Sequence, residues 1–176
     1  LVETEVRRRF RAAYARHFTA APASEVSERA CWRSVVDDVF QPCGQASPAL
    51  FESLWEHFGR GKHWRVYDDV APVWRALVGA GFRVCIASNF DARLVAVCRE
   101  LTPLDRAAAV FCSTQAGYSK PRRGFFEHVQ TRLHAAAAEL LLVGDDRRRD
   151  YDAALDAGWN ALHLAREGGA SYPASR

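Results

Sequence analysis

Three aspartates stand within six residues directly after an apolar run, and this spacing is the strongest chemical signal in the chain. Leucine and valine fill residues 140–143, and Gly144 leads into Asp145, Asp146 and, after three arginines, Asp150. Adjacent carboxylates repel one another unless a cation or the nearby arginines offset their charge. Two interpretations follow. The stretch is either a solvated turn with an aspartate at the start of the next helix, or a set of carboxylates that holds a divalent cation.

Polar residues of a complementary kind follow two other apolar runs. Ser88 and Asn89 come directly after residues 82–87, and Lys120 lies a few residues beyond residues 109–112. Each also has an ordinary explanation, because Ser88 and Asn89 suit a helix-capping turn and Lys120 suits a solvated position before a proline. Taken in this order, however, a hydroxyl, an amide, a lysine and several carboxylates suit an anionic, metal-assisted substrate such as a phosphate.

The elements around these residues predict a parallel sheet. Short apolar runs alternate with helical patterns, giving strands at 82–87, 109–112, 140–143 and 160–164 and helices at 69–80, 91–101, 124–134 and 150–157. Strands separated by such helices form a parallel sheet that is covered on both faces. Ligands collect at the carboxyl ends of the strands of such a sheet. The polar residues above are therefore expected to gather at one edge.

The first third of the chain reads as helical. Apolar residues recur at helical spacing in residues 2–18, 24–40 and 47–58. In the second of these helices the expected buried positions are Val26, Ala30, Val35 and Val39. We expect a helical segment over 1–64, an α/β core over 65–166 and a flexible tail over 167–176, which is rich in Gly, Ser and Pro.

Composition limits the classes of function. With 176 residues, 49% hydrophobic and 26% charged, the chain has the balance of a soluble globular protein. A net charge of +3 is too small to indicate a nucleic-acid partner, and no apolar run reaches the roughly 18 residues of a membrane span. The five cysteines form no Cys-x-x-Cys pair, which favours reduced thiols in a cytoplasmic protein over a disulfide framework or a zinc site. The oligomeric state stays open.

Three motifs in this order resemble those of haloacid dehalogenase-like hydrolases, in the group that carries a helical cap. Residues 86–91 resemble the second motif, Lys120 and Pro121 the third, and residues 143–151 the fourth. The resemblance implies a three-layer, Rossmann-like α/β fold in which residues 1–64 form part of the cap. It also implies an Mg²⁺-dependent phosphatase that acts on a small phosphorylated metabolite through an aspartyl-phosphate.

The resemblance assigns a role to each candidate residue. Ser88 and Asn89 correspond to contacts with the transferring phosphoryl group, and Lys120 to the residue that stabilises this group and the nucleophile. Asp145, Asp150 and Asp146 correspond to the acidic metal site. The arginines at 147–149 make this loop unusually basic for the family, which leaves the substrate preference open.

The family's first motif has no counterpart in this sequence. In the family it is an Asp-x-Asp sequence that follows the first core strand. The resemblance places that strand between the strand that ends at Ser88 and the strand that ends just before Asp145. The first Asp of the motif is the nucleophile. Because the chain starts at Leu1 and contains no methionine, we expect an N-terminally truncated phosphatase that is inactive on its own.

Two alternatives differ in class, the non-catalytic relative and the receiver-like domain, and a third, the dehalogenase, differs in its chemistry only. A non-catalytic relative would serve as a binding or regulatory module without the first motif. A 2-haloacid dehalogenase needs no magnesium, so the acidic fourth motif argues against it. A receiver-like signalling domain would place its lysine after its paired acids, whereas Lys120 precedes Asp145 and Asp146 here.

Overall fold

The structure is a computed structural model that describes residues 1–18, 22–44 and 46–166 of the chain. It divides into two compact units, one over Leu1–Gly117 and the other from Tyr118 onward. The boundary predicted between residues 64 and 65 stays a prediction. The predicted flexible tail at 167–176 lies outside the described residues.

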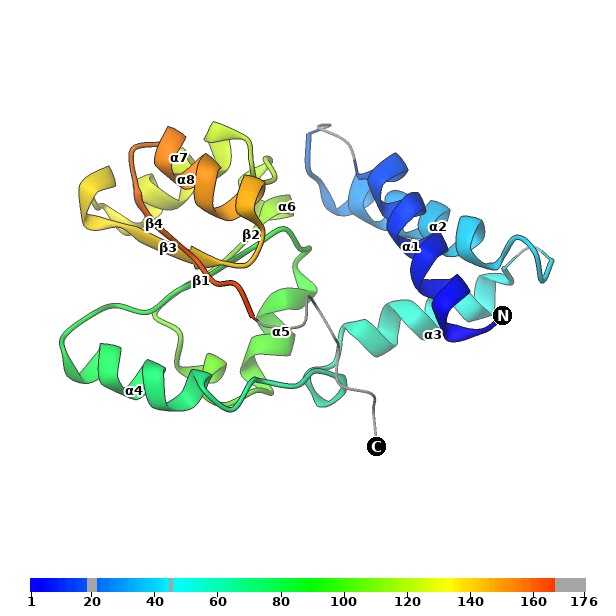
Figure 1. The fold of residues 1–176 in the computed structure, drawn as a ribbon, viewed down its shortest axis with the longest axis horizontal. Coiled ribbons are helices and arrows are strands. Elements are labelled where there is room, and N and C mark those ends of the chain that lie inside the picture. Colours follow the sequence, from blue (N-terminus) through cyan, green and yellow to red (C-terminus); the bar gives the residue numbers. More distant parts are fainter. Residues whose placement is uncertain (19–21, 45, 167–176) are drawn as a thin grey trace. The chain divides into compact units, whose positions relative to one another are not determined.

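Three helices begin the first unit, at the positions that the apolar spacing predicts. They are α1 (Glu3–His17), α2 (Glu25–Phe40) and α3 (Pro48–Phe58) (Figure 1). Helices α1 and α2 pack on each other through Ala13, Val35 and Val39, which are buried. Ser24 starts α2, because its hydroxyl accepts a hydrogen bond from the Ser27 amide and the Ser27 hydroxyl accepts one from the Ser24 amide.

Two of the four predicted buried positions of α2 are wrong. Val35 and Val39 are buried, but Val26 is 81% exposed and Ala30 is exposed. The third buried residue of the helix is Glu28. Residues 28, 35 and 39 share one face because they are separated by whole helical turns. The prediction missed this face because a carboxylate counts as polar in an apolar pattern.

The α/β part of the first unit contains one pair of parallel strands. Its elements are a 3₁₀ turn (Gly61–His63), α4 (Val70–Gly79), β1 (Ile86–Ser88), α5 (Arg93–Arg99), a 3₁₀ turn (Leu104–Arg106), β2 (Val110–Cys112) and α6 (Ser113–Ala116). Ile86 lies opposite Val110, and Ser88 lies opposite Cys112. Leu94, Cys98 and Cys112 form the core beside this pair.

The second unit repeats the arrangement with a second parallel pair. Its elements are α7 (Arg123–Leu133), a 3₁₀ turn (Ala137–Glu139), β3 (Leu141–Gly144), the π-helical turn η4 (Arg147–Asp152), α8 (Ala153–Asp156) and β4 (Asn160–His163). Leu141 lies opposite Asn160, and Gly144 lies opposite His163. The core consists of Phe125, Phe126, Val129, Ala153, Ala154 and Trp159.

The predicted α/β fold with a helical segment at its N-terminus is confirmed, and all four predicted strands are present and parallel. Within the described residues the strands form two separate pairs, β1–β2 and β3–β4. None of the helices in the described part of the chain is long and apolar enough to cross a membrane.

The capping box at Ser24 gives a first prediction. Ser24→Ala removes the acceptor for the Ser27 amide, and such a cap is worth about 1 kcal/mol of folding free energy. Ser34→Ala is the control, because the Ser34 hydroxyl donates to the Ala30 carbonyl within the same helix and does not cap its end. Urea unfolding followed by circular dichroism should show the loss for Ser24→Ala alone. Equal stability of the two variants would show that the cap does not stabilise α2.

Candidate functional site

The carboxyl end of β1 carries Ser88 and Asn89, both half-buried, at the start of a tightly held loop. Ser113, at the end of β2, is fully buried, and its hydroxyl donates to the Phe90 carbonyl at 3.0 Å. This hydrogen bond thus joins the end of β2 to the loop that follows β1, at the residue after Asn89. This bond limits the movement of the loop that the sequence assigns to a phosphate.

An ion pair between Asp91 and Arg93 fixes the far side of the same loop. Asp91 is only 1% exposed, and its two oxygens accept from Arg93 Nε at 2.8 Å and from Arg93 Nη2 at 2.6 Å. The remaining Arg93 nitrogen, Nη1, donates to the Trp55 carbonyl, and the guanidinium lies over the Trp55 ring. Because Trp55 belongs to α3, this pair connects the β1 loop to the helical segment.

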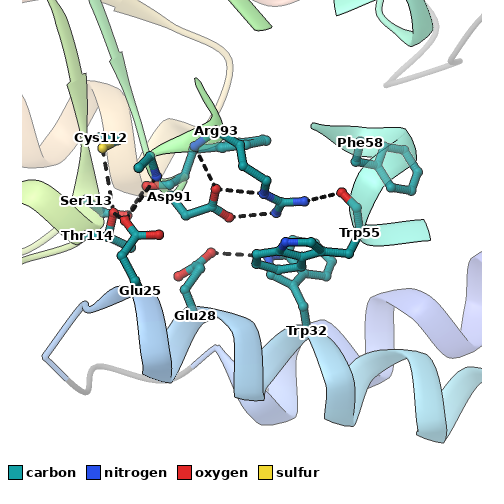
Figure 2. A network of polar contacts seen from close by, with 12 residues as sticks. Glu25, Glu28, Trp32, Trp55, Phe58, Asp91, Arg93, Cys112, Ser113 and Thr114 are labelled. Carbon is teal, nitrogen blue, oxygen red and sulfur yellow. Dashed lines mark hydrogen bonds and ion pairs between the residues drawn. The ribbon is translucent and has the colours of Figure 1, made fainter. Parts of the chain in front are cut away.

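Helix α2 reaches the same loop with two glutamates (Figure 2). Glu25 Oε1 accepts from the Ala92 amide at 3.0 Å and from the Thr114 hydroxyl. Glu28 is 8% exposed, and its Oε1 accepts from Trp32 Nε1 at 3.2 Å. The sequence did not single out either glutamate. The only signal for Glu25 is its position in the first helical turn, where a carboxylate is common anyway.

In the second unit, a buried ion pair joins Lys120 and Asp150. Lys120 Nζ lies 2.6 Å from Asp150 Oδ1, and the two side chains are 9% and 10% exposed. The other carboxylate oxygen, Asp150 Oδ2, accepts from the Asp146 amide at 3.1 Å. Two residues that are 30 positions apart in sequence, and that the sequence analysis assigned to one site, are therefore in direct contact.

The backbone around Asp150 is shaped to bring it close to the end of β3. A Cβ atom on Gly144 would overlap the Asp150 carboxyl group, so only glycine leaves the necessary space. Asp146 caps the turn that follows, because its Oδ1 accepts from the Arg149 amide at 2.8 Å. The Asp146 carbonyl accepts from the amides of both Asp150 and Tyr151, and the second bond produces the π-helical turn.

The three aspartates thus have different surroundings. Asp150 is buried against Lys120, Asp146 caps η4, and Asp145 is exposed at the carboxyl end of β3. Among the described residues, no three or more His, Cys, Asp or Glu side chains group closely enough to hold a metal ion by themselves. Mg²⁺ suits the oxygen donors of this loop even so, because it binds proteins through one or two carboxylates and completes its shell with water and substrate phosphate.

These observations define an α/β protein of the haloacid dehalogenase type, and the comparison with known families agrees. The family model described as haloacid dehalogenase-like hydrolase matches residues 4–158. This range covers most of the 176 residues, so the chain belongs to that family.

Among individual proteins, the chain is similar to haloacid dehalogenase-like hydrolase domain-containing protein 3. The protein of that name from Danio rerio is 27% identical, over 96% of this chain and 73% of its own length. The one from Homo sapiens is 27% identical, over 78% of this chain and 56% of its own length. Enolase-phosphatase E1 of Nocardia farcinica is 34% identical, over 67% of this chain and 52% of its own length.

Solved structures agree on the fold. The hydrolase YfnB of Bacillus subtilis has a TM-score of 0.72 at 18% identity, over 93% of this chain and 74% of that one. The L-2-haloacid dehalogenase of Xanthobacter autotrophicus has a TM-score of 0.73 at 19% identity, over 93% of this chain and 64% of that one. At such identities the likeness concerns the fold alone.

The contact between Gly144 and Asp150 gives a second prediction. Gly144→Ala inserts a methyl group where the Asp150 carboxyl lies, and overpacking of this kind costs about 1–3 kcal/mol. Gly79→Ala is the control, since a Cβ there meets nothing and alanine favours the α4 helix. Thermal unfolding should show a lower melting temperature for Gly144→Ala only. A melting temperature of Gly144→Ala equal to that of Gly79→Ala would contradict the close approach.

The buried ion pair gives a third prediction. Lys120→Met leaves the Asp150 carboxylate buried without its cation, which costs about 3–5 kcal/mol. Arg123→Met removes an exposed partner of Glu127 on the same unit and should cost about 0.5 kcal/mol or less. Urea denaturation of both variants measures the difference. If Lys120→Met is no less stable than Arg123→Met, the pair does not organise the second unit.

Proposed function

We propose that this chain carries the phosphate-handling and metal-binding residues of a magnesium-dependent phosphatase. The observation that carries the proposal is the buried contact between Lys120 and Asp150, at the carboxyl end of a parallel strand and beside the exposed Asp145. In open parallel sheets this end is the place where ligands bind. A lysine held beside carboxylates is the combination that neutralises a phosphoryl group and its metal ion.

Each residue receives a role that fits its surroundings. Ser88 and Asn89 would donate hydrogen bonds to phosphoryl oxygens from the loop that Ser113 and Asp91 hold in place. Lys120 would bring its positive charge to a phosphoryl oxygen while it keeps its bond to Asp150. Asp145 would bind Mg²⁺ directly, and Asp150 with Asp146 would complete the acidic surroundings. The bound ion would neutralise charge on the phosphoryl group.

Phosphate is favoured over a haloacid for a chemical reason. Displacement of halide from a 2-haloacid needs a nucleophilic carboxylate but no divalent cation. It therefore does not require a metal-binding loop such as the one that contains Asp145, Asp146 and Asp150. The 34% identity to enolase-phosphatase E1 of Nocardia farcinica points in the same direction. A non-catalytic relative remains the second candidate function, because the sequence contains no match to the first motif of the family.

The two candidates differ in turnover but not in binding. A screen of small phosphate monoesters, with and without MgCl₂, on the full product of the gene that encodes this chain should detect magnesium-dependent release of phosphate. Calorimetry of this chain with MgCl₂ should detect binding under both candidates. Binding without turnover would support the non-catalytic relative, and the absence of both would contradict the proposed function.

Asp145 gives the fourth prediction. Asp145→Asn removes the charge that would hold Mg²⁺, and in the active protein it should lower kcat/KM by roughly 100-fold or more. Asp156→Asn is the control, because Asp156 is an exposed carboxylate on α8 in the same unit. Both substitutions should leave the melting temperature almost unchanged. Equal kcat/KM for the two variants would show that Asp145 does not belong to the site.

A further inference from the structure

The contact between α2 and the β1 loop contains more negative than positive charge. Glu28 and Asp91 are both buried, and Figure 2 shows the Glu28 carboxyl reaching from α2 toward the Asp91 carboxylate. Arg93 is the cation beside them, and its charge balances one carboxylate only. If both carboxyls were ionised, this buried contact would hold one uncompensated negative charge.

The hydrogen bonds of Arg93 show that Glu28, and not Asp91, is the carboxyl whose negative charge would lack a paired cation. Arg93 Nε and Nη2 both donate to Asp91, and Nη1 donates to the Trp55 carbonyl. Glu28 accepts from the neutral indole of Trp32 instead. A buried carboxyl that has a carboxylate neighbour and only a neutral hydrogen-bond donor favours its protonated form.

The acidity of Glu28 follows from this geometry. Burial and, after it, the Asp91 carboxylate raise the pKa of Glu28 from its ordinary 4.5 to about 7. Because the pKa is raised in the folded chain, deprotonation costs stability. The contribution of this contact to the free energy of unfolding therefore falls as the pH rises from about 4.5 to about 7, and it stays low above that pH.

We propose that the proton on Glu28 acts as a latch that holds α2 against the loop following Ser88 and Asn89. With the proton bound, a neutral Glu28 lies beside Asp91, and Glu25 keeps its bonds to the Ala92 amide and the Thr114 hydroxyl. Release of the proton to solvent creates two adjacent buried carboxylates, and their repulsion moves α2 away from the loop. The effect of this movement on phosphate binding rests on the proposed function, whereas the latch itself does not.

The other charged and titratable groups around Glu28 do not alter the direction of the effect. Arg93 favours the ionised form, but it acts on Glu28 without a direct hydrogen bond. Glu25, one turn earlier on α2, adds a further negative charge and favours the protonated form. Burial and, after it, the nearby Glu28 raise the pKa of the Cys31 thiol, so the thiol stays uncharged in the same range.

The test uses Trp32 as a reporter, since its indole donates directly to Glu28. Tryptophan emission of the whole chain, recorded from about pH 5 to about pH 9, should change with a midpoint near pH 7. The change should be lost in Trp32→Phe and in Glu28→Gln. It should persist in Glu52→Gln, which removes an exposed carboxylate that pairs with Arg29. Histidines titrate in the same range, so the comparison between these variants is essential.

Hydrogen exchange then separates a latch from a simple titration. Amides of residues 89–93, corrected for intrinsic exchange, should lose protection as the pH passes 7 in the natural chain and keep it in Glu28→Gln. If Glu28→Gln does not fold, carbon NMR of the glutamate carboxyls in the natural chain replaces it. The proposal is overturned if no glutamate titrates above about pH 6, or if loop protection is the same on both sides of the transition.

These measurements need neither substrate nor turnover. Loss of protection in a protein that hydrolyses no phosphate ester would therefore leave the latch in place and contradict the proposed function alone. A protein that hydrolyses phosphate esters but keeps the same loop protection at all pH values would contradict the latch alone.

Discussion

The second unit depends on the burial of one carboxylate. Asp150 lies at the carboxyl end of β3 with both oxygens engaged, one by Lys120 and the other by the Asp146 amide. This position requires glycine at residue 144, because any side chain there would overlap the carboxyl. A buried charge with its partner in place is tolerated, whereas one without a partner is costly. The ion pair thus fixes the local backbone as well as the chemistry.

The first unit also buries an aspartate against a cationic side chain, at the end of β1. Asp91 is buried two residues beyond Asn89, and Arg93 supplies its cation. Here the pair also extends into the helical segment through Trp55, and Glu28 adds a second carboxyl that the single guanidinium does not balance. The imbalance makes this contact sensitive to protons. The geometry of the β1 loop and the position of α2 are therefore linked through charge.

The sequence was informative where one simple pattern governs the structure. Short apolar runs placed the four strands, and apolar periodicity placed most helices, within a few residues, because burial of apolar side chains dominates their stability. It failed on α2, where Val26 and Ala30 are exposed and Glu28 is buried. The contact between Lys120 and Asp150 could be expected only from the motif order. The space that Gly144 leaves for Asp150 depends on three-dimensional proximity, which no spacing in the sequence reveals.

The central claim is that the Lys120 and Asp145 side chains serve a phosphate and its metal ion. A crystal structure of this chain grown with MgCl₂ and orthovanadate, a mimic of phosphate, tests it most directly. The account predicts Mg²⁺ on the Asp145 carboxylate and vanadate within hydrogen-bond distance of Lys120 Nζ, with the bond from Lys120 to Asp150 retained. Vanadate and Mg²⁺ bound elsewhere, with neither ion at Asp145 or Lys120, would contradict it.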